Sequence, residues 1–146
     1  MSRHKIPVEL ADAMPKIVAA AQQVYDAWAQ DDEGYDEELG SGGICHLIAE
    51  DICGVLSEHG LDCGSVNAQV GENHVWVVTK IGEVGEDGEP DRLDAGVWMI
   101  DIPPSVYESG GGYNWRKIPG VTFDPSDVVV SRESPDPSDF ERYMED

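Results

Sequence analysis

Cys45, His74 and Asp101 are the residues of this sequence whose types and order could support nucleophilic catalysis. A cysteine thiolate can attack an acyl carbon, a histidine can take the thiol proton, and a carboxylate can orient the histidine. Each residue alone has a plainer explanation, since a cysteine in a helix is more often a small core residue than a nucleophile. Their joint placement, each at the end of a predicted element, is what indicates a catalytic site.

Cys45 stands near the start of a helix predicted over residues 44–59. Apolar residues recur there at helical spacing, and Gly60 is a suitable residue to end the helix. The pair Gly42–Gly43 is expected to stop the helix from extending backwards. As the second helical residue, Cys45 would keep an unpaired backbone N–H for an oxyanion, and the positive end of the helix would favour its thiolate.

The other two cysteines lack these advantages. Cys53 lies in the middle of the same predicted helix, and Cys63 lies in a predicted loop beside Asp62, whose charge disfavours a thiolate. No two cysteines have the C-x-x-C spacing of a zinc knuckle or a thioredoxin-like site. The simplest interpretation is that all the cysteines are free thiols in a reducing compartment.

His74 opens a strand predicted over residues 73–81, where the run VWVV is rich in β-branched and aromatic residues. Alternation along the strand places it on one face with Trp76 and Val78, whose apolar side chains would shield a catalytic base from water. A strand is also rigid, so it would hold the side chain of such a base in a fixed position.

Asp101 interrupts the apolar run of another strand, predicted over residues 97–102. An acid inside such a run is costly unless it is paired, and His74 would both satisfy this acid and be oriented by it. Asp94, in the polar loop before the strand, is the rival for this role.

The elements that must position these residues predict an α+β fold. A long apolar stripe predicts an N-terminal helix over residues 8–30, and the acidic, glycine-rich stretch 31–43 predicts a loop. Besides the two strands above, short strands are predicted at residues 66–70 and 128–131. Helices that precede antiparallel strands indicate N-terminal helices packed on an antiparallel sheet.

A length of 146 residues without internal repeats or a long linker predicts a single domain, residues 1–146. The acidic tail, residues 132–146, is expected to be flexible. No stretch of the sequence approaches the roughly 18 apolar residues of a membrane span, and the N-terminus lacks the apolar segment of a secretory signal. These features predict a cytoplasmic protein with no membrane partner.

The net charge is −21, from 30 acidic and 9 basic residues. Such a charge repels nucleic acid and anionic membranes, and it favours a basic protein or peptide as partner. Three explanations stay open: a solvated acidic surface, adaptation to a salty cytoplasm, and mimicry of DNA to capture a basic protein. No metal or cofactor is expected, because the sequence has no HExxH motif, no paired cysteines and no phosphate-binding glycine loop.

Three segments resemble, in order, the motifs of the transglutaminase-like branch of the papain-like cysteine peptidase superfamily. The segment GICHLIA, Gly43–Ala49, is similar to the G-x-C-x-x-x-A helix start of that family. The segment HVW, His74–Trp76, resembles its H-x-W strand. The segment WMID, Trp98–Asp101, is followed by two prolines and resembles its W-x-x-D segment. The resemblance covers residues 40–104.

The resemblance implies a papain-like or transglutaminase-like core, with Cys45 as nucleophile, His74 as general base and Asp101 as orienting acid. The implied activity is that of a cysteine-dependent hydrolase or acyltransferase: a peptidase, an amidase or a transglutaminase. Such an enzyme passes an acyl group through a thioester to water or to an amine. Related enzymes use a further oxyanion donor, for which the candidates outside any motif are Tyr35, Ser41 and Asn73.

Two other functions stay open. The chain could be a non-enzymatic acidic binding module, such as an inhibitor that mimics DNA, or an inactive relative that keeps the fold for binding only. The loop GGGYNW could line a substrate cleft with Tyr113 and Trp115, although Trp115 could equally be a core residue.

Overall fold

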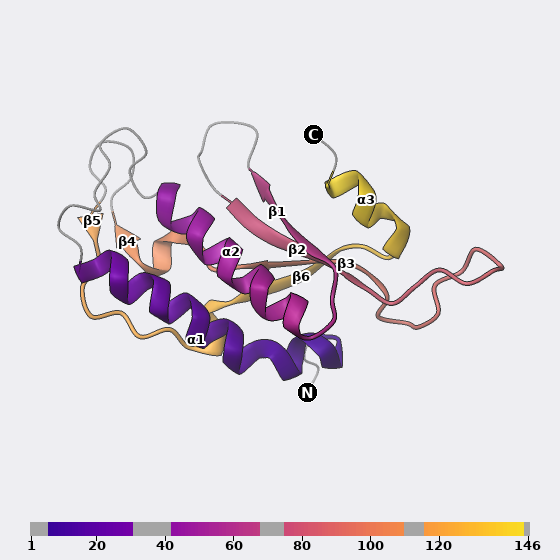
Figure 1. Ribbon diagram of the computed structural model, residues 1–146, viewed down its shortest axis with the longest axis horizontal. Helices are drawn as coiled ribbons and strands as arrows, with labels where there is room; N and C mark the ends of the chain where they lie inside the picture. The colour runs from indigo at the N-terminus through magenta and orange to yellow at the C-terminus, as the bar shows by residue number, and fades with distance from the viewer. Residues whose placement is uncertain (1–5, 31–41, 68–74, 110–115, 145–146) are drawn as a thin grey trace.

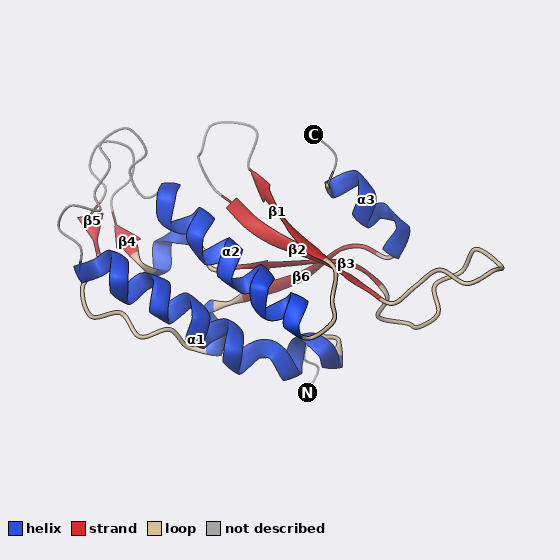
Figure 2. Cartoon of the chain, in the orientation of Figure 1, coloured by secondary structure: helices blue, strands red, loops and turns tan. Residues whose placement is uncertain are grey.

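The computed structural model describes residues 6–30, 42–67, 75–109 and 116–144. Two N-terminal helices lie against a four-stranded antiparallel sheet, as Figures 1 and 2 show, so the predicted α+β class is confirmed. The strand order in the sheet is β1-β2-β3-β6. The main elements are α1 (Val8–Gln30), α2 (Gly42–Glu58), β1 (Cys63–Asn67), β2 (Val75–Ile81), β3 (Gly96–Asp101) and β6 (Val129–Ser134).

Smaller elements complete the described chain. A two-stranded ribbon pairs β4 with β5, and the last helix of the described residues is the short α3, which lies away from α1 and α2 (Figure 1). The acidic tail that begins at residue 132 supplies the second half of β6 and the elements after it. These smaller elements are η1 (Pro104–Val106), β4 (Glu108–Ser109), β5 (Arg116–Lys117), η3 (Pro125–Asp127), η4 (Pro137–Asp139) and α3 (Phe140–Tyr143).

Helix α1 has the bounds that its apolar spacing predicts. Its fully or nearly fully buried side chains recur every three or four residues and face the core; they are Leu10, Ala13, Ile17, Ala21, Tyr25 and Trp28. At the end of this stripe, Tyr25 packs on Phe123 with ring centroids 5.4 Å apart, and Trp28 packs edge-on against Tyr107 at 5.8 Å. The stripe therefore joins the helix to the segments that connect β3 to β6.

Helix α2 begins at Gly42, two residues earlier than predicted. The expectation that Gly42–Gly43 stops the helix is wrong, because the low helix propensity of glycine is a weak effect that tertiary packing overrides. The end of the helix is as predicted within one residue. Gly60 has a φ of 79°, and the Leu61 N–H donates to the Leu56 carbonyl over 3.0 Å, which caps the last turn.

The prediction of free thiols is wrong for two of the three cysteines. Cys53 in α2 and Cys63 at the start of β1 form a disulfide, with Cα atoms 5.8 Å apart. The chain reverses at Gly60, so residues ten apart in sequence come together on a helix and a strand. Cys63 is therefore a strand residue rather than a loop residue, and β1 covers residues 63–67 instead of 66–70. Residues 68–70 lie outside the described part of the chain.

The other strands follow the predictions more closely. The described part of the strand predicted at 73–81 is β2, and the strand predicted at 97–102 is β3, which starts and ends one residue earlier. The last strand, β6, starts one residue later than predicted and continues three residues further, to Ser134. It pairs with β3, and a bulge at Val97 and Trp98 shifts their register.

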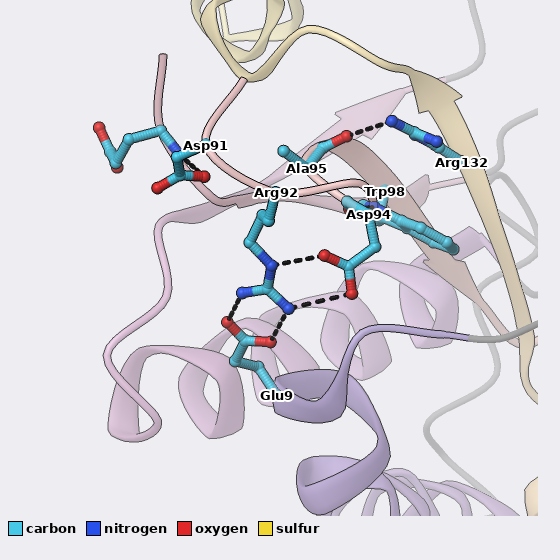
Figure 3. Close-up of polar contacts among 8 residues, drawn as sticks. Glu9, Asp91, Arg92, Asp94, Ala95, Trp98 and Arg132 are labelled. Atoms are coloured by element: carbon cyan, nitrogen blue, oxygen red, sulfur yellow. Dashed lines mark hydrogen bonds and ion pairs between the residues drawn. The ribbon is translucent and has the colours of Figure 1, made fainter. Parts of the chain in front are cut away.

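Arg92 connects the N-terminal turn of α1 to the segment that leads into β3 (Figure 3). Its Nη2 donates to Glu9 Oε1 over 2.9 Å and to Asp94 Oδ2 over 3.0 Å, and second hydrogen bonds run to each carboxylate. The Trp98 indole N–H donates to the Asp94 carbonyl over 2.9 Å. The hydrogen bonds from Arg92 hold the pKa of Glu9 and of Asp94 below their ordinary values. The start of β3 is thereby fixed to α1.

Replacing Arg92 with glutamine is expected to lower the free energy of unfolding by about 1 kcal/mol at neutral pH. The loss is small because Arg92 and its partners Glu9 and Asp94 are partly exposed, so solvent screens their interaction. Because the folded-state pKa of each carboxylate is lowered, this stabilisation is present above the unfolded values near pH 4 and is lost as the pH falls through the folded values. The difference between wild type and Arg92→Gln should therefore shrink between about pH 5 and pH 3. Urea unfolding at several pH values measures it.

Lys80→Gln is the matched control, because Lys80 pairs over 3.3 Å with Glu83, whose side chain is 71% exposed. That change should cost only a few tenths of a kcal/mol, within about 0.5. Equal losses in the two variants would contradict a special contribution from Arg92.

Candidate active site

The three segments that resemble family motifs meet at one end of the sheet. Strands β2 and β3 are antiparallel, with Val77 opposite Ile100, so the first residues of β2 lie beside the last residues of β3. The first turn of α2 packs over this same end. The sequence separates these segments by tens of residues, and the antiparallel pairing brings them together.

A small pocket lies where these segments meet. It is lined by Cys45, Ile48, Ala49, Ile52, Val75, Trp76, Val77, Ile100, Asp101, Ile102 and Tyr107. Members of all three motifs are among these residues: Cys45 and Ala49 from the first, Trp76 from the second and Asp101 from the third. The pocket has no room for the centre of a water molecule, so it is closed to molecules of that size in this structure.

Cys45 is buried, with 4% of its surface exposed. It is the fourth residue of α2 rather than the second, because the helix starts at Gly42. It therefore stands at the end of the first turn, where hydrogen bonding within the helix takes over from unpaired N–H groups. Among the described cysteines, Cys45 is the one that forms no disulfide. The helix positions it over the first residues of β2, beside Val75.

Asp101 is the last residue of β3 and is half-buried. Its neighbours Ile100 and Ile102 are buried in the core, and its partner on β6 is Val129, which is 41% exposed. Strand alternation therefore places the Asp101 side chain on the face away from α2, the face that the register also gives to Trp76. The Asp101 side chain is thus on the opposite face of the sheet from α2 and Cys45, although both residues line the pocket at this end of the sheet.

His74 directly precedes β2 in the sequence and lies outside the described residues. The next residue, Val75, lines the pocket. The candidate oxyanion donors Tyr35, Ser41 and Asn73 also lie outside the described residues. So do the loop residues Tyr113 and Trp115, for which a cleft and, for Trp115, a core position were the alternatives.

Asp94, the rival acid, lies before β3 and therefore at the opposite end of the strand from Asp101. Its carboxylate is bound by Arg92, and its main-chain carbonyl accepts from Trp98. The Asp94 carboxylate is therefore paired with Arg92, which also binds Glu9 of α1. The structure brings Asp101, and not Asp94, to the pocket of Cys45.

Tyr107 is a pocket residue that the sequence did not indicate. It is fully buried, and its ring stands edge-on to Trp28 at 5.8 Å and to Phe123 at 6.4 Å. It lies in a turn between η1 and β4, where no periodic pattern marks a core residue. Only the folding of this turn back under α1 places its ring against the pocket.

A second, more open groove of about 580 Å³ runs between α1 and residues 119–122. Gln22 holds this segment by donating to the Val121 carbonyl over 3.1 Å and accepting from the Phe123 N–H over 2.7 Å. The Tyr25 hydroxyl accepts from the Val121 N–H over 3.1 Å. These side chains are engaged with the backbone, so their contacts fix the segment to α1.

Comparisons with models of known protein families, with curated proteins and with solved structures found no match. Within the described ranges, no helix is long and apolar enough to cross a membrane. Among the same residues, no three His, Cys, Asp or Glu side chains are grouped so that they could hold a metal ion. Function is therefore inferred from the residues of this chain alone.

Proposed function

We propose that this protein is a cysteine-dependent hydrolase or acyltransferase with a papain-like or transglutaminase-like core. Cys45 is the nucleophile, His74 the general base and Asp101 the acid that orients it. The observation that carries the proposal is the meeting of Cys45, Trp76 and Asp101, each from a different motif, at one pocket. The antiparallel pairing of β2 with β3 brings Trp76 and Asp101 together, and the packing of α2 adds Cys45 to them.

The proposed reaction is acyl transfer through a thioester. His74 takes the thiol proton of Cys45, and the thiolate attacks the carbonyl carbon of an amide. The tetrahedral intermediate expels the amine, which receives the proton from His74. Water or a second amine, deprotonated by His74, then attacks the thioester and releases the Cys45 thiol.

The proposed substrate is a protein or peptide with basic groups, because the net charge of −21 attracts cations and repels nucleic acid and anionic membranes. The proposed location is the cytoplasm. A reducing cytoplasm would favour reduction of the Cys53–Cys63 disulfide, which the sequence did not predict.

Access to Cys45 requires movement in this proposal. Cys45 is 4% exposed, and the pocket beside it has no room for the centre of a water molecule. Catalytic contacts are often loose or incomplete before substrate binds, and active-site elements commonly move to admit it. The first turn of α2 or the segments that flank it would have to shift for an acyl group to reach the sulfur.

The test is the rate at which iodoacetamide alkylates Cys45, read by mass spectrometry of the Cys45 peptide. At about pH 6.5 the His74→Ala variant is expected to react at least roughly tenfold more slowly than wild type, because the base that maintains the thiolate is gone. His46→Ala is the matched control, since His46 follows Cys45 in sequence but is exposed and pairs with Glu50 over 3.3 Å. Equal rates in wild type and His74→Ala would exclude this role of His74.

Binding without chemistry is the second candidate function, and the burial of Cys45 favours it. An acidic module of this kind would retain a basic probe, such as polylysine, at low salt and release it at high salt. It would do so equally in wild type and in Cys45→Ser. Salt-sensitive binding together with ordinary thiol reactivity at Cys45 would select this function over the enzyme.

A further inference from the structure

The Cys53–Cys63 disulfide and the closed pocket share one helix. Cys53 follows Ile52, a pocket residue, and its bond partner Cys63 is the first residue of β1. The bond therefore fixes the turn of α2 that carries Ile52 to the neighbouring strand. Cys45 lies two turns earlier on the same helix, so the tether also limits how far the helix can move above the sheet.

The disulfide is partly accessible from solution. Cys53 and Cys63 are both half-buried rather than buried. Gly54, next to Cys53, is exposed, and a side chain added there would meet nothing within 4 Å. The exposed Ser57 places its hydroxyl 3.7 Å from Cys63 Sγ. A small dithiol can therefore approach the bond from the outer side of α2.

Noncovalent contacts also hold this end of α2, where Ile52, Val55 and Leu56 are buried in the core. Strand β1 stands at the edge of the four-stranded sheet and pairs only with β2 there. The connection between α2 and β1 is held by the Thr79 hydroxyl and the Lys80 N–H, which donate to the Asp62 carbonyl over 2.7 Å and 2.9 Å. These contacts fix the connecting turn to β2, and the disulfide is the covalent restraint on the helix itself.

We propose that the Cys53–Cys63 disulfide is a redox gate for Cys45. The intact bond holds α2 against β1 and keeps the pocket closed, and reduction lets α2 shift so that reagents and substrates reach the thiol. One thiolate of a dithiol attacks a sulfur of the bond and expels the other cysteine, and the second dithiol sulfur then displaces the first cysteine. Two electrons and two protons pass to Cys53 and Cys63, and the dithiol leaves as a cyclic disulfide.

The gate concerns access to Cys45 and is measured without any substrate, whereas its biological meaning rests on the proposed role of Cys45 as nucleophile. In the reducing cytoplasm proposed above, the site would be open, and oxidising conditions would close it. The gate thereby reconciles a buried thiol with a function that requires contact with a substrate.

The experiment compares Cys45 alkylation by iodoacetamide in three samples: oxidised wild type, wild type reduced with dithiothreitol and then desalted, and Cys53→Ser/Cys63→Ser. Mass spectrometry separates the Cys45 peptide from those of Cys53 and Cys63. The rate at Cys45 is expected to be at least about tenfold higher in the reduced protein and in the double variant. A buried thiol is labelled only when the structure around it opens, and this opening should be more frequent without the disulfide. Rates within about twofold of the oxidised protein would overturn the gate.

A matched control separates opening of the pocket from general loss of stability. Arg92→Gln weakens the contact of α1 with the start of β3 and leaves the disulfide intact. It should keep Cys45 as slow as in oxidised wild type, and labelling as fast as in the reduced protein would overturn the gate. In His74→Ala the ratio of reduced to oxidised rates should persist. A persistent ratio with no change in absolute rate would keep the gate and remove the proposed catalytic role of His74.

Discussion

Replacing Gly96 with alanine is expected to lower the free energy of unfolding by about 3–5 kcal/mol, a large part of the stability of a domain of this size. Gly96 has a φ of 145°, a backbone conformation that residues with side chains rarely adopt. A Cβ at this position would overlap the Ser134 carbonyl oxygen and lie 3.1 Å from its carbonyl carbon. Both contacts are with the backbone of β6, which cannot rotate away. Urea unfolding followed by circular dichroism measures the loss.

The expected loss has a functional consequence, because Gly96 is the first residue of β3 and Asp101 is the last. A shift of β6 to relieve the overlap would disturb the strand that carries the candidate acid. Gly88→Ala is the matched control: Gly88 also has a positive φ, of 82°, but its added Cβ would meet nothing within 4 Å. That variant should lose about 1–2 kcal/mol from backbone strain alone. Equal losses would mean that the overlap with Ser134 is relieved without cost.

Replacing Asp101 with asparagine is expected to slow acylation of Cys45 by an activated aryl ester by about a hundredfold, while the protein stays folded. Asparagine keeps the size of the side chain but removes the charge that would orient and stabilise the His74 imidazolium. The mass increase of the Cys45 peptide, measured over time, gives the rate. The half-buried position of Asp101 at the strand end makes the change tolerable for the fold.

Asp51→Asn is the control for this prediction. It changes the net charge by the same amount and lies on α2, as Cys45 does, but Asp51 is exposed and does not line the pocket. Its acylation rate should stay within about twofold of wild type, since a screened surface charge has little effect at this distance. If Asp51→Asn slowed acylation of Cys45 as much as Asp101→Asn, the loss of one negative charge, and not the position of Asp101, would explain the effect.

The helices and strands were largely predictable because their signals are local. The apolar stripe of α1 marks residues 8–30, and the structure has the same bounds. The start of α2 was less predictable: the burial of Ile44 and Cys45 in its first turn outweighs the weak preference of Gly42–Gly43 against a helix. Strand β1 was displaced by three residues because an edge strand of mixed composition carries little periodic signal.

The sequence by itself determined the α+β class, most element positions and the segments from which a Cys45 site would be built. Only the tertiary structure decided that Cys45 and Asp101 line one pocket, that Tyr107 lines it too, and that the pocket is closed. It also decided the Cys53–Cys63 bond and the contact of Arg92 with Glu9, which joins residues 83 apart in the chain. Periodicity and capping depend on residues within a few positions of each other. Pockets, disulfides and ion pairs depend on distances that only the packing of the whole chain sets.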